Sequence, residues 1–201
     1  MKQAVLKVIG QAALLLRDDI DTDAIFPAEY LKTTVREGMR AHLFADWVRA
    51  DKPEVAFLRM PQRVSILVVP RNFGCGSSRE HAVWALADQG IQAVVALSFG
   101  DIFRNNCVKN DVLAAVVTPH DHARLCGCFG AGATQTLALD VAGRNLQLPD
   151  GSELPFHLAP GHAEQLMSSE DDIARTLRLG DALSAYEARV ARRSPWLSGM
   201  D

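Results

Sequence analysis

Three short apolar runs, separated by helix-length segments, most constrain the fold of this chain. They are Val64–Val69, Ile91–Leu97 and Val112–Val117. A continuous apolar run of this length is typical of a strand covered on both faces. Helices are expected between the runs, at Glu80–Gln89 and about Asp101–Asn106. Two strand–helix–strand units in series predict an α/β fold with a mostly parallel core sheet and crossover helices.

The segments outside this core predict added elements. In chain order these are a strand at Ala4–Ile9, short helical pieces between Ala28 and Trp47, a hairpin of Leu137–Val141 and Asn145–Leu148, and a helical end from Ser169 to Arg193 that is divided at Gly180. No internal repeat or low-complexity linker interrupts the sequence. We therefore expect one domain, 1–201, with a C-terminal helical tail from about residue 161.

Acidic and basic side chains are nearly balanced. The chain has 24 Asp and Glu against 21 Lys and Arg, and a net charge of -3. A nucleic-acid-binding domain usually carries a basic excess, so no nucleic acid is expected as a partner. The one basic cluster, Arg189, Arg192 and Arg193, suits the solvated C-terminal end of a helix.

Hydropathy gives no sign of a membrane partner or of export. No apolar run reaches the ~18 residues that a membrane span needs. The beginning of the chain has Lys2 and an apolar stretch, but Lys7 and Gly10 interrupt it and no small-residue cleavage site follows. We expect a cytoplasmic protein.

The cysteines predict neither a disulfide framework nor a metal site. In a chain this long, four cysteines do not resemble a secreted disulfide scaffold. Cys126 and Cys128 are too close for the usual zinc half-site, although His120 and His122 leave a metal cluster as the alternative to a loop with incidental cysteines. Cys75 with His81 could form a thiolate–imidazole pair, but a nucleophilic site needs further groups, so an inert cysteine is favoured. The four cysteines are Cys75, Cys107, Cys126 and Cys128.

The segment Asn72–His81 carries the strongest sign of chemistry. It lies between a buried strand and a helix, where open parallel sheets place their ligand sites. Gly74 and Gly76 let the backbone turn sharply, and the helix N-terminus that follows favours an anion. Arg79 adds a planar fork that grips a carboxylate through two hydrogen bonds. Together these parts predict a small anion site.

A capping box is the alternative interpretation of this turn. Ser77 would cap the helix and Glu80, three residues on, would reach back to it. This arrangement accounts for Ser77 and Glu80 but not for Ser78 and Arg79. The segment lacks the Gly-Lys-Ser/Thr end of a Walker A loop and the third glycine of a dinucleotide fingerprint.

Several motifs in order resemble one family. Gly74–Ala82 is similar to the signature of the swivelling domain of the aconitase superfamily, and Asp21–Ile25 and Ser98–Asn106 stand in that family's order. His42–Trp47 and a C-terminal stretch narrow the resemblance to the small subunits of 3-isopropylmalate dehydratase (isopropylmalate isomerase). The C-terminal residues concerned are Asp171, Asp172, Ile173, Thr176, Leu177, Asp181, Tyr186 and Glu187. The resemblance covers nearly the whole chain and weakens between about residues 118 and 160.

The resemblance implies an aconitase-like swivelling β/β/α domain in a two-chain hydro-lyase. That enzyme interconverts 2-isopropylmalate and 3-isopropylmalate in leucine biosynthesis by dehydration and rehydration. The resemblance assigns a [4Fe-4S] cluster to the large subunit, so this chain is expected to bind no cofactor and to be inactive alone. The alternatives are a paralogous hydro-lyase for dimethylmalate, citraconate or homoaconitate, and a non-catalytic anion-binding module.

The resemblance also implies roles for the serines and the arginine. Ser77 is the expected catalytic base, acting as an alkoxide, while Ser78 and Arg79 hold a substrate carboxylate. Helix-terminal amides and Arg79 are the groups that would stabilise such an alkoxide once water is excluded. A base cannot also be a full helix cap, so Ser78 becomes the alternative cap.

Three upstream residues are expected to contact substrate. Asp23 matches the family's active-site aspartate, with a helix N-cap as the alternative role. Lys32 and Thr33 occupy the recognition loop near the position where aconitase has an arginine for citrate, which disfavours citrate. The residues expected to support the loop without touching substrate are Gly74, Gly76, Glu80 and His81.

Overall fold

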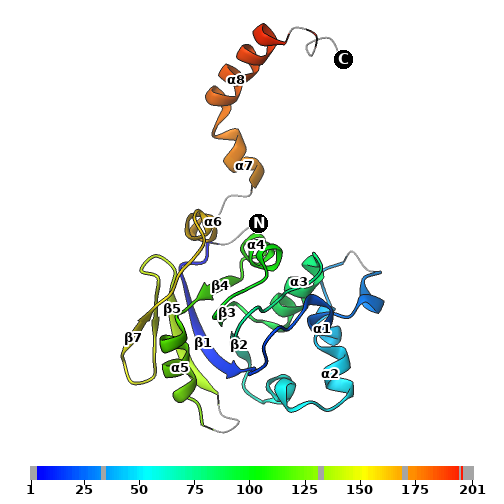
Figure 1. Cartoon of the computed structure of the whole chain (residues 1–201), viewed down its shortest axis with the longest axis vertical. Coiled ribbons are helices and arrows are strands. Elements are labelled where there is room, and N and C mark those ends of the chain that lie inside the picture. Colours follow the sequence, from blue (N-terminus) through cyan, green and yellow to red (C-terminus); the bar gives the residue numbers. More distant parts are fainter. Residues whose placement is uncertain (1–3, 33–34, 131–133, 169–171, 195, 197–201) are drawn as a thin grey trace. The chain divides into compact units, whose positions relative to one another are not determined.

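The computed structural model describes two compact units of the chain (Figure 1). The larger unit spans residues 4–167, and the smaller contains the described residues from 168 onward. Helix α6, His162–Met167, belongs to the larger unit, so the division falls after the expected start of the tail at 161. A single domain of 1–201 stays a prediction. The described residues are 4–32, 35–130, 134–168, 172–194 and 196.

Four parallel strands form the core of a seven-stranded sheet, which confirms the α/β fold class. The order across the sheet is β4-β3-β2-β1-β5-β6-β7. Neighbouring strands from β1 to β4 pair in parallel, and β1 pairs with β5 in antiparallel fashion. The parallel strands are β1 (Lys7–Leu14), β2 (Val64–Val68), β3 (Ala93–Ala96) and β4 (Leu113–Val116).

The first strand begins and ends later than the sequence predicts. We expected Ala4–Ile9, with Gly10 and Gln11 outside, but both lie inside β1. Gly10 pairs with Leu137 of β5, and a Cβ at Gly10 would lie 2.0 Å from the Ser65 hydroxyl oxygen. Gly10, which interrupts the apolar stretch at the beginning of the chain, therefore allows β1 and β2 to approach closely.

The expected hairpin is confirmed at the other side of β1. Strands β5 (Gln135–Asp140) and β6 (Asn145–Gln147) pair in antiparallel register, with Leu139 opposite Leu146. A third strand, β7 (Glu153–Pro155), extends the sheet. Strand β7 was not predicted, because three residues are too few to show an alternating pattern.

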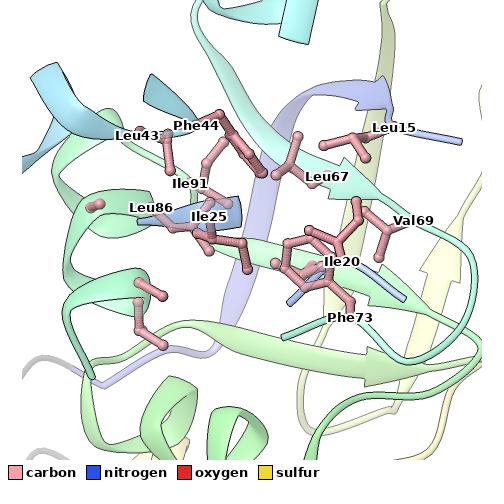
Figure 2. Close-up of a cluster of buried hydrophobic side chains, with 14 of the residues drawn as sticks. Leu15, Ile20, Ile25, Leu43, Phe44, Leu67, Val69, Phe73, Leu86 and Ile91 are labelled. Atoms are coloured by element: carbon pink, nitrogen blue, oxygen red, sulfur yellow. The ribbon is translucent and has the colours of Figure 1, made fainter. Parts of the chain in front are cut away.

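Alternation along the strands places a hydrophobic cluster on each face of the sheet. In β2, Ile66 and Val68 join one cluster while Leu67 joins the other together with Val69. Helix α3 packs in the cluster that contains Leu67, and Figure 2 shows Leu86 from this helix near Ile25 and Ile91. Because both faces are covered, the continuous apolar runs correspond to a buried parallel sheet.

Most expected helices are confirmed. Helix α3 is Glu80–Gln89, closed by Gly90 at a φ of 101°, and α4 is Asp101–Lys109. The expected helical pieces between Ala28 and Trp47 are present as short elements. These and their neighbours are α1 (Thr22–Ile25), η1 (Ala28–Tyr30), η2 (Met39–His42), α2 (Ala45–Arg49) and η3 (Pro53–Arg59).

The segment with Cys126 is helical and not a loop, so that expectation is wrong. Helix α5, Pro119–Gly127, begins with Thr118 as its N-cap, whose hydroxyl accepts from the Asp121 amide at 3.2 Å. A threonine followed by proline is a clear signal for the start of a helix, and here it outweighs the glycine and cysteine residues that suggested a loop.

The smaller unit contains the two expected C-terminal helices. They are α7, Asp172–Leu177, and α8, Gly180–Arg193. Arg192 and Arg193 are exposed in the last turn of α8, which confirms a solvated helix end. None of the described helices is both long and apolar enough to span a membrane.

Candidate active site

Two loops meet at the carboxyl ends of the parallel strands. The acidic loop, Asp18–Asp23, follows β1, and the glycine–serine loop, Asn72–Arg79, follows β2. The Gly74 amide donates to the Ile20 carbonyl at 2.7 Å, and the Thr22 amide donates to the Cys75 carbonyl at 2.9 Å. These bonds hold the two loops together at the edge where parallel sheets place their ligand sites.

Left-handed glycines shape the glycine–serine loop. Gly74 and Gly76 have φ values of 72° and 84°. A Cβ at Gly74 would lie 2.1 Å from the Phe103 ring, so a side chain there is excluded twice, by the backbone and by the space. The tight turn carries Ser77 and Ser78 to an exposed position before α3.

Neither serine caps helix α3, so the capping-box expectation and its Ser78 alternative are wrong. The helix begins at Glu80, and its N-cap is Arg79, with no side-chain capping hydrogen bond. Arg79 has an extended backbone (φ -123°, ψ 101°), which separates the serines from the first helical turn. The two hydroxyl groups are therefore not committed to capping.

A buried threonine fixes the backbone of Ser77. The Thr22 side chain is 2% exposed, and its hydroxyl donates to the Ser77 carbonyl at 2.9 Å. We did not predict a role for Thr22, because the sequence does not show which residue of Asp21-Thr22-Asp23 points inward. The sign of this role in the sequence is a small hydroxyl residue, Thr22, between two aspartates.

Asp23 and Arg79 form the ion pair at the centre of the site. One arm of the Arg79 guanidinium donates to the Asp23 carboxylate and also lies 3.4 Å from the Phe26 carbonyl oxygen. The same Asp23 oxygen accepts from the Ala28 amide at 2.9 Å. The hydrogen bond from Arg79 holds the pKa of Asp23 below its usual value, although partial burial opposes this. The Arg79 side chain is only 17% exposed, which strengthens the pair.

The helix-cap alternative for Asp23 is wrong. The N-cap of α1 is Asp21, whose carboxylate accepts from the Ala24 amide at 2.7 Å. Asp23 lies inside α1, one residue after Thr22, and its carboxylate reaches Arg79 across the loop contact.

Glu80 and His81 contact groups outside the glycine–serine loop. The Glu80 carboxylate accepts from the Asn110 amide at 2.8 Å and from the Trp84 indole nitrogen at 3.3 Å, which joins α3 to the end of α4. The His81 ring stacks on Phe26, with ring centroids 5.8 Å apart. Loop support without substrate contact stays a prediction for both residues.

The structure does not bring Lys32, one of the two expected recognition residues, together with the Asp23–Arg79 pair. Lys32 is exposed just after the end of η1, and the structure describes no contact between it and the Asp23–Arg79 pair. Thr33 lies outside the described residues. Their contact with substrate stays a prediction.

The cysteines give no sign of nucleophilic or metal chemistry. Burial, Asp21 and Asp19 raise the pKa of the Cys75 thiol, which disfavours a thiolate. His122 is buried, and its Nε2 lies 2.8 Å from the Val69 carbonyl oxygen, while its Nδ1 lies 3.6 Å from the Cys126 sulfur. Within the part of the chain that the structure describes, no three His, Cys, Asp or Glu side chains gather to hold a metal ion.

The fold and the two joined loops define a domain of the aconitase class. Residues 2–119, which include both loops, match the family model of the aconitase C-terminal domain. A crystal structure of 3-isopropylmalate dehydratase from Methanocaldococcus jannaschii has the same fold, with a TM-score of 0.66 and 24% sequence identity. The similarity covers 90% of this chain and 99% of that one.

Sequence comparison shows which family of the aconitase class this chain belongs to. Residues 172–199 match the family model for the C-terminal domain of the 3-isopropylmalate dehydratase small subunit. The chain is 43% identical to the 3-isopropylmalate dehydratase small subunit of Rhodospirillum centenum, over 94% of this chain and 96% of that protein. It is 45% identical to the 3-isopropylmalate dehydratase small subunit of Methylobacterium radiotolerans, over 92% of this chain and 95% of that protein. The chain belongs to the family of 3-isopropylmalate dehydratase small subunits.

Replacement of Thr22 by valine should loosen the glycine–serine loop. Thr22→Val keeps the shape of the side chain but removes the bond to the Ser77 carbonyl, so we expect a loss of about 1 kcal/mol in urea unfolding. We also expect faster exchange of the amides of residues 22 and 74, which donate to Cys75 and Ile20 and join the two loops. Thr22→Ser removes a buried methyl group and should lower the free energy of unfolding by a similar amount to Thr22→Val. Because it keeps the hydroxyl group, it should keep amide exchange as slow as in the unmodified protein. Equal amide exchange rates in Thr22→Val and the unmodified protein would contradict this role of the Thr22 hydroxyl.

Replacement of Asp23 by asparagine should destabilise the chain only above acidic pH. Because the folded state lowers the pKa of Asp23, its stabilisation is full above the usual value of 3.8 and is lost as pH falls through the lowered value. We expect Asp23→Asn to cost about 0.5–1 kcal/mol at neutral pH, as for other ion pairs with an exposed partner. Urea unfolding at a series of pH values should show the difference shrinking in acid. A difference that stays constant with pH would exclude the charge as its cause.

Proposed function

We propose that this chain is the small subunit of a cytoplasmic 3-isopropylmalate dehydratase that serves leucine biosynthesis. With a large subunit it would interconvert 2-isopropylmalate and 3-isopropylmalate by loss and return of water. The observation that carries the proposal is an exposed serine pair beside the Asp23–Arg79 ion pair, in a chain of this family. Neither nucleic acid nor a membrane is a partner in this proposal.

Arg79 and Ser78 are the proposed binding groups for a substrate carboxylate. Asp23 and the Phe26 carbonyl engage one terminal nitrogen of the guanidinium and fix its orientation. The remaining N–H groups of the fork are the proposed donors to a substrate carboxylate, and Ser78 is exposed one residue earlier. A fixed cation and a flexible hydroxyl suit a small acid better than a bulky ligand.

Ser77 is the proposed catalytic base. Its alkoxide would take the proton from the carbon next to the one that bears the hydroxyl group. The electron pair of that C–H bond becomes the second bond of an alkene, and the hydroxyl group leaves as water with a second proton. When water adds back to the alkene with its hydroxyl group on the other carbon, the hydroxyl group has moved to the neighbouring carbon. The Thr22 hydroxyl donates a hydrogen bond to the Ser77 carbonyl, so the backbone from which the proposed base projects is fixed.

Departure of the hydroxyl group is the proposed task of the large subunit. The residues described in this chain do not fit an iron–sulfur cluster, since three or more suitable side chains come together nowhere among them. In this proposal the [4Fe-4S] cluster lies on the partner, as the resemblance to the family implies. The contribution of this chain is to bind the diacid, orient it and move one proton.

The choice of diacid separates this proposal from a paralogous hydro-lyase. Purified small and large subunits, assayed together, should turn over 3-isopropylmalate with a higher kcat/KM than dimethylmalate, citraconate or homoaconitate. We expect a difference of at least about tenfold, because an extra branch in an apolar pocket is worth about 1–3 kcal/mol. Faster turnover of another diacid would exclude the leucine assignment. Diacid binding by the lone chain, with no turnover in the complex, would instead indicate an anion-binding module.

Removal of the Ser77 hydroxyl should abolish most of the proton transfer. In the reconstituted enzyme we expect Ser77→Ala to lower kcat by at least about a hundredfold, as for other losses of a catalytic base. Ser78→Ala should mainly raise KM, and Ser152→Ala, in the turn before β7, should match the unmodified enzyme. Retention of most turnover in Ser77→Ala would show that another group is the base.

A further inference from the structure

Two residues at the entrance of the paired loops have a left-handed backbone. Asp19 of the acidic loop and Asn72 of the glycine–serine loop have φ values of 54° and 57°. Aspartate and asparagine enter this region more readily than most residues with a side chain, but glycine enters it without steric cost. Glycine would therefore suffice for the two turns, and a side chain at both positions indicates a further role.

The two side chains bind each other. The Asn72 side-chain nitrogen donates to the Asp19 carboxylate at 2.8 Å. The Asn72 side chain is half-buried, while Asp19 is exposed. The backbone supports the same contact, because the Asp19 amide donates to the Arg71 carbonyl at 3.1 Å. Since the acceptor is charged, this hydrogen bond is stronger than one between two neutral groups.

The bond between Asp19 and Asn72 is the first of a series that runs along both loops. In chain order the paired residues are Asp19 with Asn72, Ile20 with Gly74, Thr22 with Cys75 and Ser77, and Asp23 with Arg79. Both loops advance in the same direction through this series, as parallel strands do. Figure 2 shows Ile20 and Phe73, one from each loop, in the same hydrophobic cluster. The pairing of β1 with β2 therefore continues beyond the strands to the residues of the candidate site.

Asn72 also joins the glycine–serine loop to the segment after β3. Its backbone amide donates to the Ser98 hydroxyl oxygen at 2.8 Å, and the Phe73 amide donates to the Ser98 carbonyl at 3.1 Å. The Gly100 amide donates back to the Phe73 carbonyl at 2.9 Å. Asn72 therefore contacts both neighbours of its loop, the acidic loop with its side chain and the segment after β3 with its backbone.

We propose that Asn72 is a positioning residue for the Ser77 base and that it acts through Asp19. This inference rests on the proposed function and deepens it. The bond to Asn72 holds the acidic loop at its entrance. Three residues further along the same loop, Thr22 holds the Ser77 carbonyl. A shift of the acidic loop at Asp19 would therefore move the support of the proposed base.

Loss of this bond should lower kcat more than it raises KM. The long Arg79 side chain can follow a shifted Asp23 carboxylate by rotation about its single bonds, so its proposed grip on a substrate carboxylate would persist. The Ser77 hydroxyl oxygen is bonded directly to Cβ and moves with its backbone. Small misplacement of a catalytic group slows the reaction, and the loss appears in kcat when substrate binding is kept.

The test is a double-mutant cycle in the reconstituted enzyme. Asn72→Gly and Asp19→Gly each allow the left-handed turn but remove the bond. We expect each to lower kcat for 3-isopropylmalate about three- to tenfold, the range for the net contribution of one hydrogen bond, and to change KM by less than about twofold. The double variant should be no slower than either single variant, because both remove the same contact. Asp19→Asn keeps an oxygen that can accept the bond and should retain most of the turnover.

Arg144→Gly is the matched control for the added freedom of a glycine. Arg144 has the same left-handed backbone, with a φ of 51°, in the turn between β5 and β6. This turn lies at the other end of β1 from the two loops, because the last residue of β5, Asp140, pairs with Lys7. Its kcat and KM should therefore match those of the unmodified enzyme. Unchanged kcat in Asn72→Gly, or additive losses in the double variant, would overturn the proposal.

Amide exchange of the small subunit alone separates this inference from the proposed function. In Asn72→Gly the amides of Asp19 and Gly74, which donate across the two loops, should exchange at least about threefold faster than in the unmodified protein. In Arg144→Gly both should stay slow. Equal exchange in Asn72→Gly would overturn the inference even if the enzyme turns over 3-isopropylmalate. Faster exchange in a chain whose complex turns over no diacid would leave the loop contact established but overturn the proposed function, and with it the role in catalysis.

Discussion

Parallel pairing between β1 and β2 is the constraint on which the site depends. Parallel strands place their carboxyl ends at the same edge, so the acidic loop and the glycine–serine loop emerge side by side. Two backbone hydrogen bonds, from Gly74 to Ile20 and from Thr22 to Cys75, then join loops more than 50 residues apart in sequence. Had β1 run in the opposite direction, Asp23 would lie at the far end of the sheet from Arg79.

Some groups at this edge of the sheet hold the loops in position, while the serine hydroxyl groups take no part in helix capping. Thr22 and Asp23 reach different partners from one short helix, the first the Ser77 carbonyl and the second Arg79. The helix that follows takes no cap from Ser77 or Ser78. Turns of this composition commonly use the serine hydroxyl to satisfy helix amides. Here Ser77 and Ser78 remain exposed beside an oriented cation, and the proposed diacid site rests on this arrangement.

Pattern alone predicted the core because its elements are governed by local rules. The helix Glu80–Gln89 with Gly90 at its end and the hairpin of β5 and β6 follow from periodicity and turn residues. The turn that brings Arg79 and the two glycines together was also predictable in outline, since these residues are close together in sequence; its role as an anion site stays a prediction. The role of Thr22, the N-cap Asp21 and the extended backbone at Arg79 were not. Each depends on how two distant loops meet, which no single segment encodes.

The Asp23–Arg79 pair has a consequence for the charge that the site presents. Because the Arg79 guanidinium is paired with an internal carboxylate, the pair itself adds almost no net positive charge where we propose that a diacid binds. Asp23 acts as a built-in counter-ion that orients the arginine while weakening its long-range attraction for stray phosphate or carboxylate. Selectivity of the proposed site for its diacid would then come from close-range geometry. In the proposed complex, much of the positive charge that balances the diacid would come from the second subunit.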